Sequence, residues 1–533
     1  MKPQALLIIL LIIMTLTAKA QITTDGTLGA ALKLSGPDYQ IEAGLGQQLG
    51  GNLFHSFQDF NLQHLESATF SGPNTVQNVI SRVTGGNPSS IDGLIRSTIP
   101  NADMYFINPY GIMFGPNARL DVQGSFHAST ADYLRLQDGG SVEARHPNNS
   151  LLTVAPVEAF GFLTHSPAPL SLESSQLTVP LQSTLSLISG HLTLHQAQLT
   201  APFGRINLAS LAESGEVIPT FEEFVVPSLR GDITMKDQSL ITVSGKGGGN
   251  IFIRGGQFVI DNSTIEAKTL GSQDGGVIDI RVDNLSLAYG ATINSLTEGS
   301  GRGANIYMQA TDSITVSGKS ANSENAQRSG IYADSGIFQQ RTDDNLGDAG
   351  DIVLEAKNIS FQDNSVISAS SYGGGKGGDL AIKASDYVSF RGKPESDSSL
   401  IESATYSESQ QAGDAGSISI EAKNILLAEG SYLNSNTNGK GKGGNVTLKA
   451  DEGVMIEGPK PNIDVDTLYQ EPGGGDAGNL LIEAKTISLT GAELSGVTLG
   501  EGNASTITLH ADTITLDNSS IRMDTAGPGM VAR

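Results

Sequence analysis

The second half of the chain alternates apolar and polar residues in short runs that are separated by Gly-rich turns. Two examples are "GGGNIFIRGGQFVIDNSTIEAKT" and "GDAGNLLIEAKTISLTGAELSGVT". This period of two predicts β-strands. The residue that follows each Gly-rich turn sets a common register, in which most successive positions are 27 or 28 residues apart. The registered positions are Asn250, Val277, Asn305, Asp351, Asp379, Ser417, Asn445, Asn479 and Thr506.

Each of these units has room for three short strands. A period near 28 residues with longer exceptions is typical of a solenoid that tolerates insertions. The units therefore predict a parallel β-helix, in which each strand pairs with its equivalent one coil on, about 4.8 Å away. The third strand carries an aliphatic residue at one constant position, which predicts a ladder inside the solenoid. Its members are Ile265, Ile293, Ile331, Ile367, Ile401, Leu433, Ile463, Leu494 and Ile521.

The turns and the insertions add two expectations. From Asp351 onward the turns roughly alternate between "GDAG" and "GKGG", which indicates a super-repeat of two coils. The insertions, "GKSANSENAQRSG" among them, are polar and contain glycine. They fall mainly between the second and third strands of a unit, and we expect them to be surface loops.

The first half, residues 21 to about 210, is also rich in strand patterns but has more apolar and aromatic residues. Residues 104–126, "MYFINPYGIMFGPNARLDVQGSF", contain two turn signals, N-P-Y-G and G-P-N-A, between short apolar runs. These turns predict the corners of a β-helix, with the aromatic residues filling its core.

The first twenty residues, "MKPQALLIILLIIMTLTAKA", contain a basic residue, an apolar run and an A-K-A pattern. This order predicts a secretory signal peptide at residues 1–20, and the apolar run is shorter than a membrane-spanning helix requires. The chain contains no cysteine. A secreted chain without disulfides must gain its stability from apolar burial and backbone pairing.

Composition narrows the classes of function. The chain has 533 residues, 64 of them glycine, and 32 basic against 56 acidic residues give a formal charge of −24. Such a charge repels phosphate backbones, so we expect no nucleic-acid partner. His191 and His195 have H-x-x-x-H spacing, but they lie in an alternating strand pattern and the chain has no cysteine, so no zinc site is predicted. No G-x-S-x-G sequence is present, so that serine-hydrolase motif is not predicted either, and we expect no cofactor.

Three short motifs have both a chemical and a structural interpretation. Residues 374–379, "GGKGGD", match a calcium-binding repeat, but the full match stands alone and fits an ordinary coil turn. Arg230, Gly231 and Asp232 form a weak adhesion motif, although "RGDITM" also has the form that starts other coils. Asp and Asn recur before the third strand, where a polysaccharide-degrading site or simple turn chemistry would place them. These pairs are Asp261-Asn262, Asp363-Asn364 and Asp517-Asn518.

The first half carries a recognisable set of segments. These are "QITTDGTLG", "GGNLFHSFQDFNL", "VISRVTGGNPSSIDGLIR", "MYFINPYGIMFGPNARLDVQGSFHAST" and "LTAPFGRINLAS". In this order they closely resemble the N-terminal domain of filamentous-haemagglutinin-like exoproteins of two-partner secretion systems. The resemblance implies an all-β chain with a capped right-handed β-helix as its N-terminal domain. It also implies a partner, an outer-membrane barrel transporter whose POTRA domains recognise that domain, and a surface adhesin or an aggregation or biofilm factor as the product.

The family's N-P-N-G-I motif corresponds here to Asn108, Pro109, Tyr110, Gly111 and Ile112. Tyr110 departs from the family, but position i+2 of a type I turn keeps a negative φ and does not require Asn. We therefore expect the turn to form and to take part in recognition by the transporter. The companion N-P-N-L motif has at best a degenerate counterpart in residues 59–62, "DFNL".

These observations predict a signal peptide at residues 1–20, a secretion domain at 21–230 and β-helix repeats at 231–533. The favoured function is that of a non-enzymatic exoprotein, secreted to the surface or surroundings of a Gram-negative bacterium, with receptors or glycans on host or neighbouring cells as partners. The alternative is a β-helix enzyme that degrades polysaccharides. The last coil has no evident cap, so the chain is expected to be part of a longer array, to self-associate, or to be capped by residues 525–533.

Overall fold

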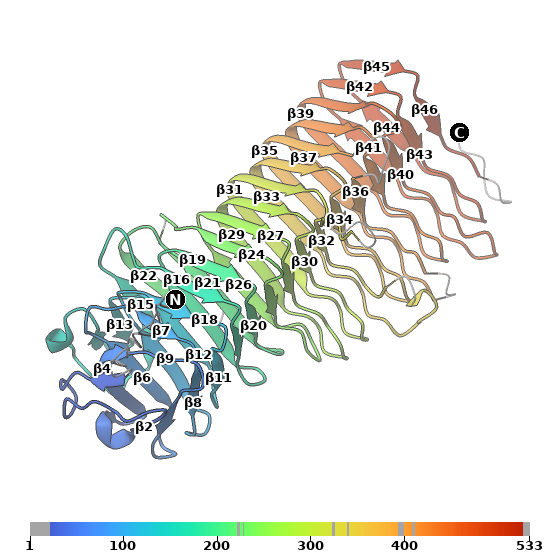
Figure 1. Cartoon of the computed structure of the whole chain (residues 1–533). Helices are drawn as coiled ribbons and strands as arrows, with labels where there is room; N and C mark the ends of the chain where they lie inside the picture. Colours follow the sequence, from blue (N-terminus) through green and yellow to red (C-terminus); the bar gives the residue numbers. More distant parts are fainter. Residues whose placement is uncertain are drawn as a thin grey trace, which may run out of the picture.

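The computed structural model describes residues 22–220, 224–227, 229–321, 326–337, 340–392, 399–407 and 411–525. The predicted signal peptide and residues 526–533 lie outside this part of the chain. The described residues form one long solenoid whose coils are stacked along a single axis (Figure 1). They include two short 3-10 turns, η1 (Ala43–Leu45) and η2 (Pro147–Asn149), and no helix among the described residues is long and apolar enough to cross a membrane. The predicted parallel β-helix is confirmed.

Each coil contributes strands to three parallel columns. The first column begins with β4 (Asn52–Phe60), β6 (Asn78–Val83), β9 (Asp103–Ile107), β12 (Phe126–Ser129), β18 (Thr184–Ser189), β21 (Arg205–Ser210) and β26 (Asn250–Arg254). The second begins with β7 (Ser89–Ile91), β10 (Ile112–Phe114), β16 (Leu170–Glu173), β19 (Leu192–His195), β24 (Ile233–Lys236) and β27 (Gln257–Asp261). β24 pairs with both β19 and β27, so the solenoid continues without a break through residue 230.

The expectation of three separate short strands per coil is wrong for the middle of the repeat region, where the first two strands merge. Gly255 and Gly256 separate β26 from β27, whereas Val282 and Asp283 occupy the equivalent positions in the next coil and lie inside one continuous strand. A register shift between Val282 and Asn284 still marks the corner. The merged strands are β29 (Val277–Ala288), β31 (Asn305–Ser317), β33 (Ile352–Gln362), β35 (Leu380–Arg391), β37 (Ile418–Ala428) and β39 (Val446–Glu457). The strands separate again into β41 (Leu480–Glu483), β42 (Thr486–Thr490), β44 (Ile507–His510) and β45 (Thr513–Asp517).

The third column carries the predicted aliphatic ladder. The nine residues from Ile265 to Ile521 pair with one another in the predicted register, and all except Ile521 are fully buried. The early strands are β2 (Asp38–Glu42), β5 (Ser67–Ser71), β8 (Leu94–Ser97) and β11 (Arg119–Asp121). The later strands are β17 (Gln176–Thr178), β20 (Gln198–Thr200), β25 (Leu240–Thr242), β28 (Thr264–Glu266), β30 (Thr292–Asn294), β32 (Gly330–Tyr332), β34 (Val366–Ser368), β36 (Leu400–Glu402), β38 (Tyr432–Asn434), β40 (Asn462–Asp464), β43 (Glu493–Ser495) and β46 (Ser520–Arg522).

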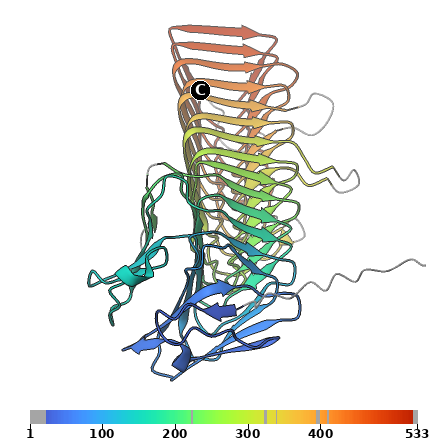
Figure 2. The same ribbon diagram turned by 60° about the vertical axis from the view of Figure 1, so that its left-hand side comes forward.

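The insertions occupy two corners of the coil, not mainly one as the sequence predicted. Residues 318–329 lie between β31 and β32, as expected, but residues 336–346 follow β32, and residues 468–476 follow β40. Both corners lie between strands, so the added residues do not interrupt the pairing of strands from one coil to the next. The described parts of the longer insertions project from one side of the solenoid (Figure 2).

The Gly-rich corner explains the register of the repeat. Where the residue after the turn is Asn or Asp, its side chain accepts a hydrogen bond from the backbone N–H of its equivalent one coil on. Asn305 Oδ1 accepts from Asp351 at 3.0 Å, Asp351 Oδ1 from Asp379 at 3.0 Å, and Asp379 Oδ1 from Ser417 at 2.8 Å. This ladder satisfies backbone donors where the sheet is interrupted. The residues chosen from sequence as the register are therefore those that connect the coils.

Charge alternation accounts for the two-coil super-repeat. Lys376 of a "GKGG" turn donates its backbone N–H to Asp348 of the preceding "GDAG" turn at 2.8 Å, and its Nζ lies 3.9 Å from Oδ2 of Asp414 in the following one. The same alternation of charge occurs on the strands. Lys383 of β35 lies opposite Glu421 of β37, with 3.9 Å between Nζ and Oε2. Like charges stacked directly opposite would repel, so alternate coils carry opposite signs.

The N-terminal end differs from the repeats in two ways. β1 (Ile22–Thr24) and β3 (Gln47–Leu49) pair antiparallel with β4, which caps the first coil as expected. An antiparallel sheet also stands on the outer face of the first column (Figure 2). A second apolar core between them contains Ile107, Ile188, Leu134 and Phe160. We call this sheet the cover sheet; its strands are β13 (Tyr133–Leu136), β14 (Ser141–Glu143), β15 (Val157–Phe162), β22 (Gly215–Pro219) and β23 (Phe224–Val225).

Candidate functional site

The N-P-Y-G turn joins β9 to β10 and has the predicted geometry. The backbone N–H of Gly111 donates to the carbonyl of Asn108 at 3.2 Å, and Oδ1 of Asn108 accepts the N–H of Tyr110 at 3.0 Å. Gly111 has a φ of 121°, a conformation that side chains oppose, whereas Tyr110 has a negative φ. The aromatic neighbours Phe106, Phe114 and Phe126 are fully buried, as the sequence predicted.

The side chain of Asn108 is fully buried and fixed to the neighbouring coil. Its Nδ2 donates to the carbonyl of Asn87 and to Oγ of Ser89, both at 3.0 Å. A substitution that removes this amide would leave buried acceptors without a donor, which costs about 1–3 kcal/mol per group. Asn108 is therefore a structural determinant of the stacked turns.

The degenerate counterpart of the companion motif contacts the same neighbouring coil. Asn61 Oδ1 accepts the backbone N–H of Ser90 at 2.8 Å, and Asp59 Oδ1 accepts Nδ2 of Asn87 at 2.9 Å. The segment around Asn87 is thus held by both motif regions, and neither Asn87 nor Ser89 was predicted as a site residue. The repeated Asn-Pro dipeptide, at residues 87–88 and 108–109, is the sequence signal that could have indicated them.

Tyr110, which replaces the family's Asn, contacts the loop beside the cover sheet. The guanidinium carbon of Arg145 lies 5.1 Å from the centre of the Tyr110 ring. Arg145 also donates to the carbonyl of Pro109 at 3.4 Å and to Oδ1 of Asp132 at 2.5 Å, and Asp132 is buried. The substitution is compatible with the turn and adds a cation–π contact to the cover region.

A buried arginine links the cap, the coils and the cover sheet. Arg82 is almost fully buried and donates to Ser56 Oγ at 2.8 Å, to the carbonyl of Glu143 at 2.8 Å and to Thr27 Oγ1 at 2.9 Å. Burial lowers its pKa, and the nearby carboxylates of Asp25 and Glu143 oppose that change. Sequence reasoning did not identify Arg82, because its partners lie far along the chain.

A second group of polar side chains holds the cover sheet together. Arg135 pairs with Glu158 and, at 2.9 Å, with Glu216, whose Oε1 also accepts the hydroxyl of Tyr133 at 2.9 Å. Burial, followed by this hydrogen bond, raises the pKa of Tyr133 to about 12. These groups join β13, β15 and β22, so they position the cover sheet as a unit.

The remaining motifs lie in structural turns. In residues 374–379, Asp379 joins the side-chain ladder, and no group of three His, Asp or Glu residues suited to a metal ion occurs in the described part of the chain. Gly231 is buried, and Nη1 of Arg230 lies 3.7 Å from Oδ1 of Asp283, so the geometry does not favour the adhesion motif, whose role stays a prediction. The Asp-Asn pairs adopt positive φ at their turns, as turn chemistry predicts, at Asn262, Asp363, Asn364 and Asn518.

Comparison with known proteins adds independent information. A family described as "TPS secretion domain" matches residues 20–223. The heme/hemopexin-binding protein of Haemophilus influenzae is 31% identical over 85 residues, which cover 16% of this chain and 9% of that protein. The HMW1 secretion domain from Haemophilus influenzae aligns with a TM-score of 0.35 and 15% identity over 94% of this chain and 98% of that one. Residues 20–223 are therefore assigned as a TPS secretion domain.

Proposed function

We propose that this chain is exported through a dedicated outer-membrane transporter and acts outside the cell as a non-enzymatic adhesin or aggregation factor. TPS exoproteins are secreted by Gram-negative bacteria with the help of a partner transporter, and the secretion domain over residues 20–223 is the observation that carries the proposal. The periplasmic POTRA domains of a barrel transporter would recognise that domain after Sec-dependent export. The stacked turns around Asn108, with Gly111 at the end of the motif, would supply the required local shape.

Export should fail when this turn is disrupted. We expect the Asn108→Ala plus Gly111→Val double variant to accumulate in the cell, because the first change removes two buried hydrogen bonds and the second forces a side chain into a positive φ. The measurement is the secreted fraction of the full chain, co-expressed with its transporter. Tyr110→Asn, which introduces the family's residue at a position with negative φ, is the matched control and should be secreted normally.

Two results would contradict the export proposal. One is normal secretion of the double variant, and the other is secretion of the unchanged chain from cells that lack the transporter. Hydrogen exchange of the accumulated double variant separates a local defect at the turn from a general failure to fold.

The repeat region would act as the adhesive part. It presents long, outward-facing rows of alternating charge on a solenoid, as in the row from Lys383 to Glu421, and extended surfaces of this kind suit repeated contacts. Bacteria that secrete the chain should sediment faster as aggregates than an otherwise identical strain without the gene. Equal sedimentation, with the chain present on the cells, would count against the adhesive role.

The contacts of the described residues favour this proposal over the enzymatic alternative. Ser186 Oγ lies 2.9 Å from Nδ1 of His127, which resembles a nucleophile and base, but Ser186 is fully buried and also receives a hydrogen bond from Asn207. Burial lowers the pKa of His127 to about 4, so it would be a poor base at neutral pH. The contact is part of a row of stacked side chains on neighbouring strands.

A further inference from the structure

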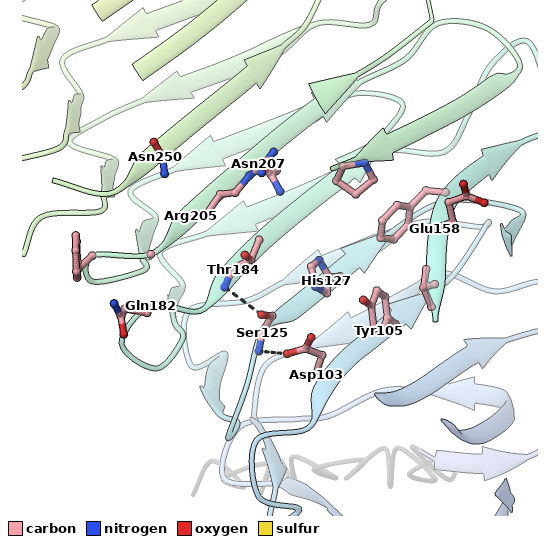
Figure 3. Close-up of a pocket in the computed structure, with 15 residues that line it drawn as sticks. Asp103, Tyr105, Ser125, His127, Glu158, Gln182, Thr184, Arg205, Asn207 and Asn250 are labelled. Carbon is pink, nitrogen blue, oxygen red and sulfur yellow. Dashed lines mark hydrogen bonds between the residues drawn. The ribbon is translucent and has the colours of Figure 1, made fainter. Parts of the chain in front are cut away.

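A cleft of about 540 Å³ lies between the outer face of the first strand column and the cover sheet. Figure 3 shows Tyr105 and His127 on neighbouring strands of its floor, with Glu158 on a strand opposite them and Gln182 on a loop near its other end. Small-molecule sites commonly have volumes of about 300–1,000 Å³. The cleft and the N-P-Y-G turn lie at opposite ends of β9.

Hydrogen bonds along the floor fix the orientation of its polar groups. Arg205 can only donate, so its Nε contact of 2.6 Å assigns Oδ1 of Asn207 as the acceptor. The amide of Asn207 then donates to Ser186 Oγ at 3.1 Å. The hydroxyl of Ser186 keeps its proton available for Nδ1 of His127, 2.9 Å away. In the tautomer that accepts this proton, His127 carries its own proton on Nε2.

Two polar groups of the floor have no protein partner within the described residues. Burial lowers the pKa of His127, with Arg205 adding to this and Asp103 opposing it, so the ring is neutral at physiological pH. In the tautomer with the proton on Nε2, that nitrogen is a donor that faces the cleft. The ring of Tyr105 stacks on it at 4.5 Å, and burial together with Asp103 raises the pKa of Tyr105, so its hydroxyl keeps its proton. Both residues line the cleft, and Tyr105 is only partly buried, so both groups can exchange a hydrogen bond with a ligand there.

The walls present both donors and acceptors without an excess of one charge. Asp103 has one oxygen engaged by the N–H of Ser125 at 2.7 Å, and Glu158 is paired with Arg135. Arg205 lies against the ring of Phe252, 4.2 Å from its centre. The amide side chains of Gln182 and Asn250 also line the cleft. Carboxylates would repel an anion, and Arg205 would repel a cation.

We propose that this cleft binds a neutral, polyhydroxylated ligand, namely a sugar unit of a glycan. Its hydroxyl groups would accept from Nε2 of His127, exchange a hydrogen bond with the hydroxyl of Tyr105 and donate to Asp103. The site goes beyond the proposed function, because it lies in the secretion domain and requires neither the transporter nor the repeat region.

The test uses the purified full chain and the neutral sugars D-glucose, D-galactose, D-mannose and N-acetyl-D-glucosamine, with binding measured by saturation-transfer NMR and calorimetry. At least one should bind with a dissociation constant of about 1 mM. His127→Phe keeps the ring stack and removes the Nε2 donor, and Tyr105→Phe removes a single hydroxyl. Each should weaken binding by about tenfold or more, which corresponds to about 1.4 kcal/mol.

Tyr307→Phe is the matched control, because Tyr307 is half exposed in the same outward-facing row but lies outside this cleft. It should leave affinity unchanged. The proposal is overturned if none of the four sugars binds, if both cleft variants bind like the unchanged chain, or if Tyr307→Phe weakens binding equally. Stronger binding of glucuronate or glucosamine than of every neutral sugar would also overturn it. Tyr105→Phe keeps the test decisive should His127→Phe fail to fold.

Discussion

Gly416→Ala is expected to unfold the coils around it, lowering local stability by about 3 kcal/mol or more because added atoms in a closed site must displace their surroundings. A Cβ at Gly416 would lie well inside contact distance of the carbonyl oxygen of Gly378, the equivalent glycine one coil earlier. The same clash recurs between Gly378 and Gly350 and between Gly444 and Gly416. The corner glycines are therefore required for the close approach of one backbone to the next.

The matched control is Gly474→Ala, also in a Gly-rich turn. Its nearest atoms, Cδ1 and the carbonyl oxygen of Tyr469, are 3.4 Å away, which is ordinary contact. We expect a change within about 0.5 kcal/mol. Because a solenoid need not unfold as one unit, the measurement is hydrogen exchange of peptides from neighbouring coils. Equal protection in the two variants would show that the corner tolerates a side chain.

The repeat region is expected to lose stability as the pH rises from about 4 to about 7, because it buries carboxyl groups. Ser368 Oγ lies 2.5 Å from Oδ1 of Asp334 and 3.2 Å from Oε1 of Glu402, and its single proton can serve only one of them. One carboxyl group of the pair must therefore be protonated for both contacts to be favourable. Burial, and then the charge of Glu402, raises the pKa of Asp334 to about 7.

The sign of the pH dependence follows from the raised pKa of these carboxyl groups. A group whose pKa is raised in the folded state stabilises the fold below its unfolded value, near 4 for Asp, and that contribution is lost as the pH rises through the folded value. One pKa unit is worth about 1.4 kcal/mol, and with allowance for screening we expect a loss of about 2 kcal/mol from this pair. Asp464, whose pKa burial also raises to about 7, should act in the same direction.

The measurement is thermal unfolding of the full chain at about pH 4 and about pH 8, combined with hydrogen exchange near β32 and β36. Asp334→Asn removes one titrating group at nearly constant volume and should flatten the pH dependence. Asp386→Asn is the control, because Asp386 lies outside the Asp334–Ser368–Glu402 contacts. A chain that becomes more stable with rising pH would contradict the prediction.

Local patterns predicted much of the architecture. Period-two alternation and the Gly-rich turns were sufficient to place the ladder from Ile265 to Leu494 and the register that runs through Asp351 and Asp379. The turn at Asn108 was also predictable, because Asn, Pro and Gly each favour one position of a type I turn. These features depend on residues that are close in sequence or repeat at a fixed spacing.

The merged strands and the second insertion corner were not predicted. The residues at this corner, Val282 and Asp283 in one coil, do not show whether the strand continues, because its continuity depends on pairing with the coils on either side. An insertion such as residues 336–346 has no periodicity of its own, so its corner is defined only when the flanking strands are paired. The alternation of charge over two coils was visible in the sequence. Its cause became clear only from the structure, which stacks the opposite charges of neighbouring coils on one another.

The sequence alone determined that this is a repeat solenoid and that its first half carries a secretion domain, since each of those signals is carried by neighbouring or regularly spaced residues. Only the tertiary structure revealed the cover sheet, the network around Arg82 and the cleft between β15 and the coils. Arg82 and the carbonyl of Glu143 are 61 residues apart, and His127 and Ser186 are 59 apart. Contacts at such separations follow no local period, because they depend on where the folded coils bring distant segments together.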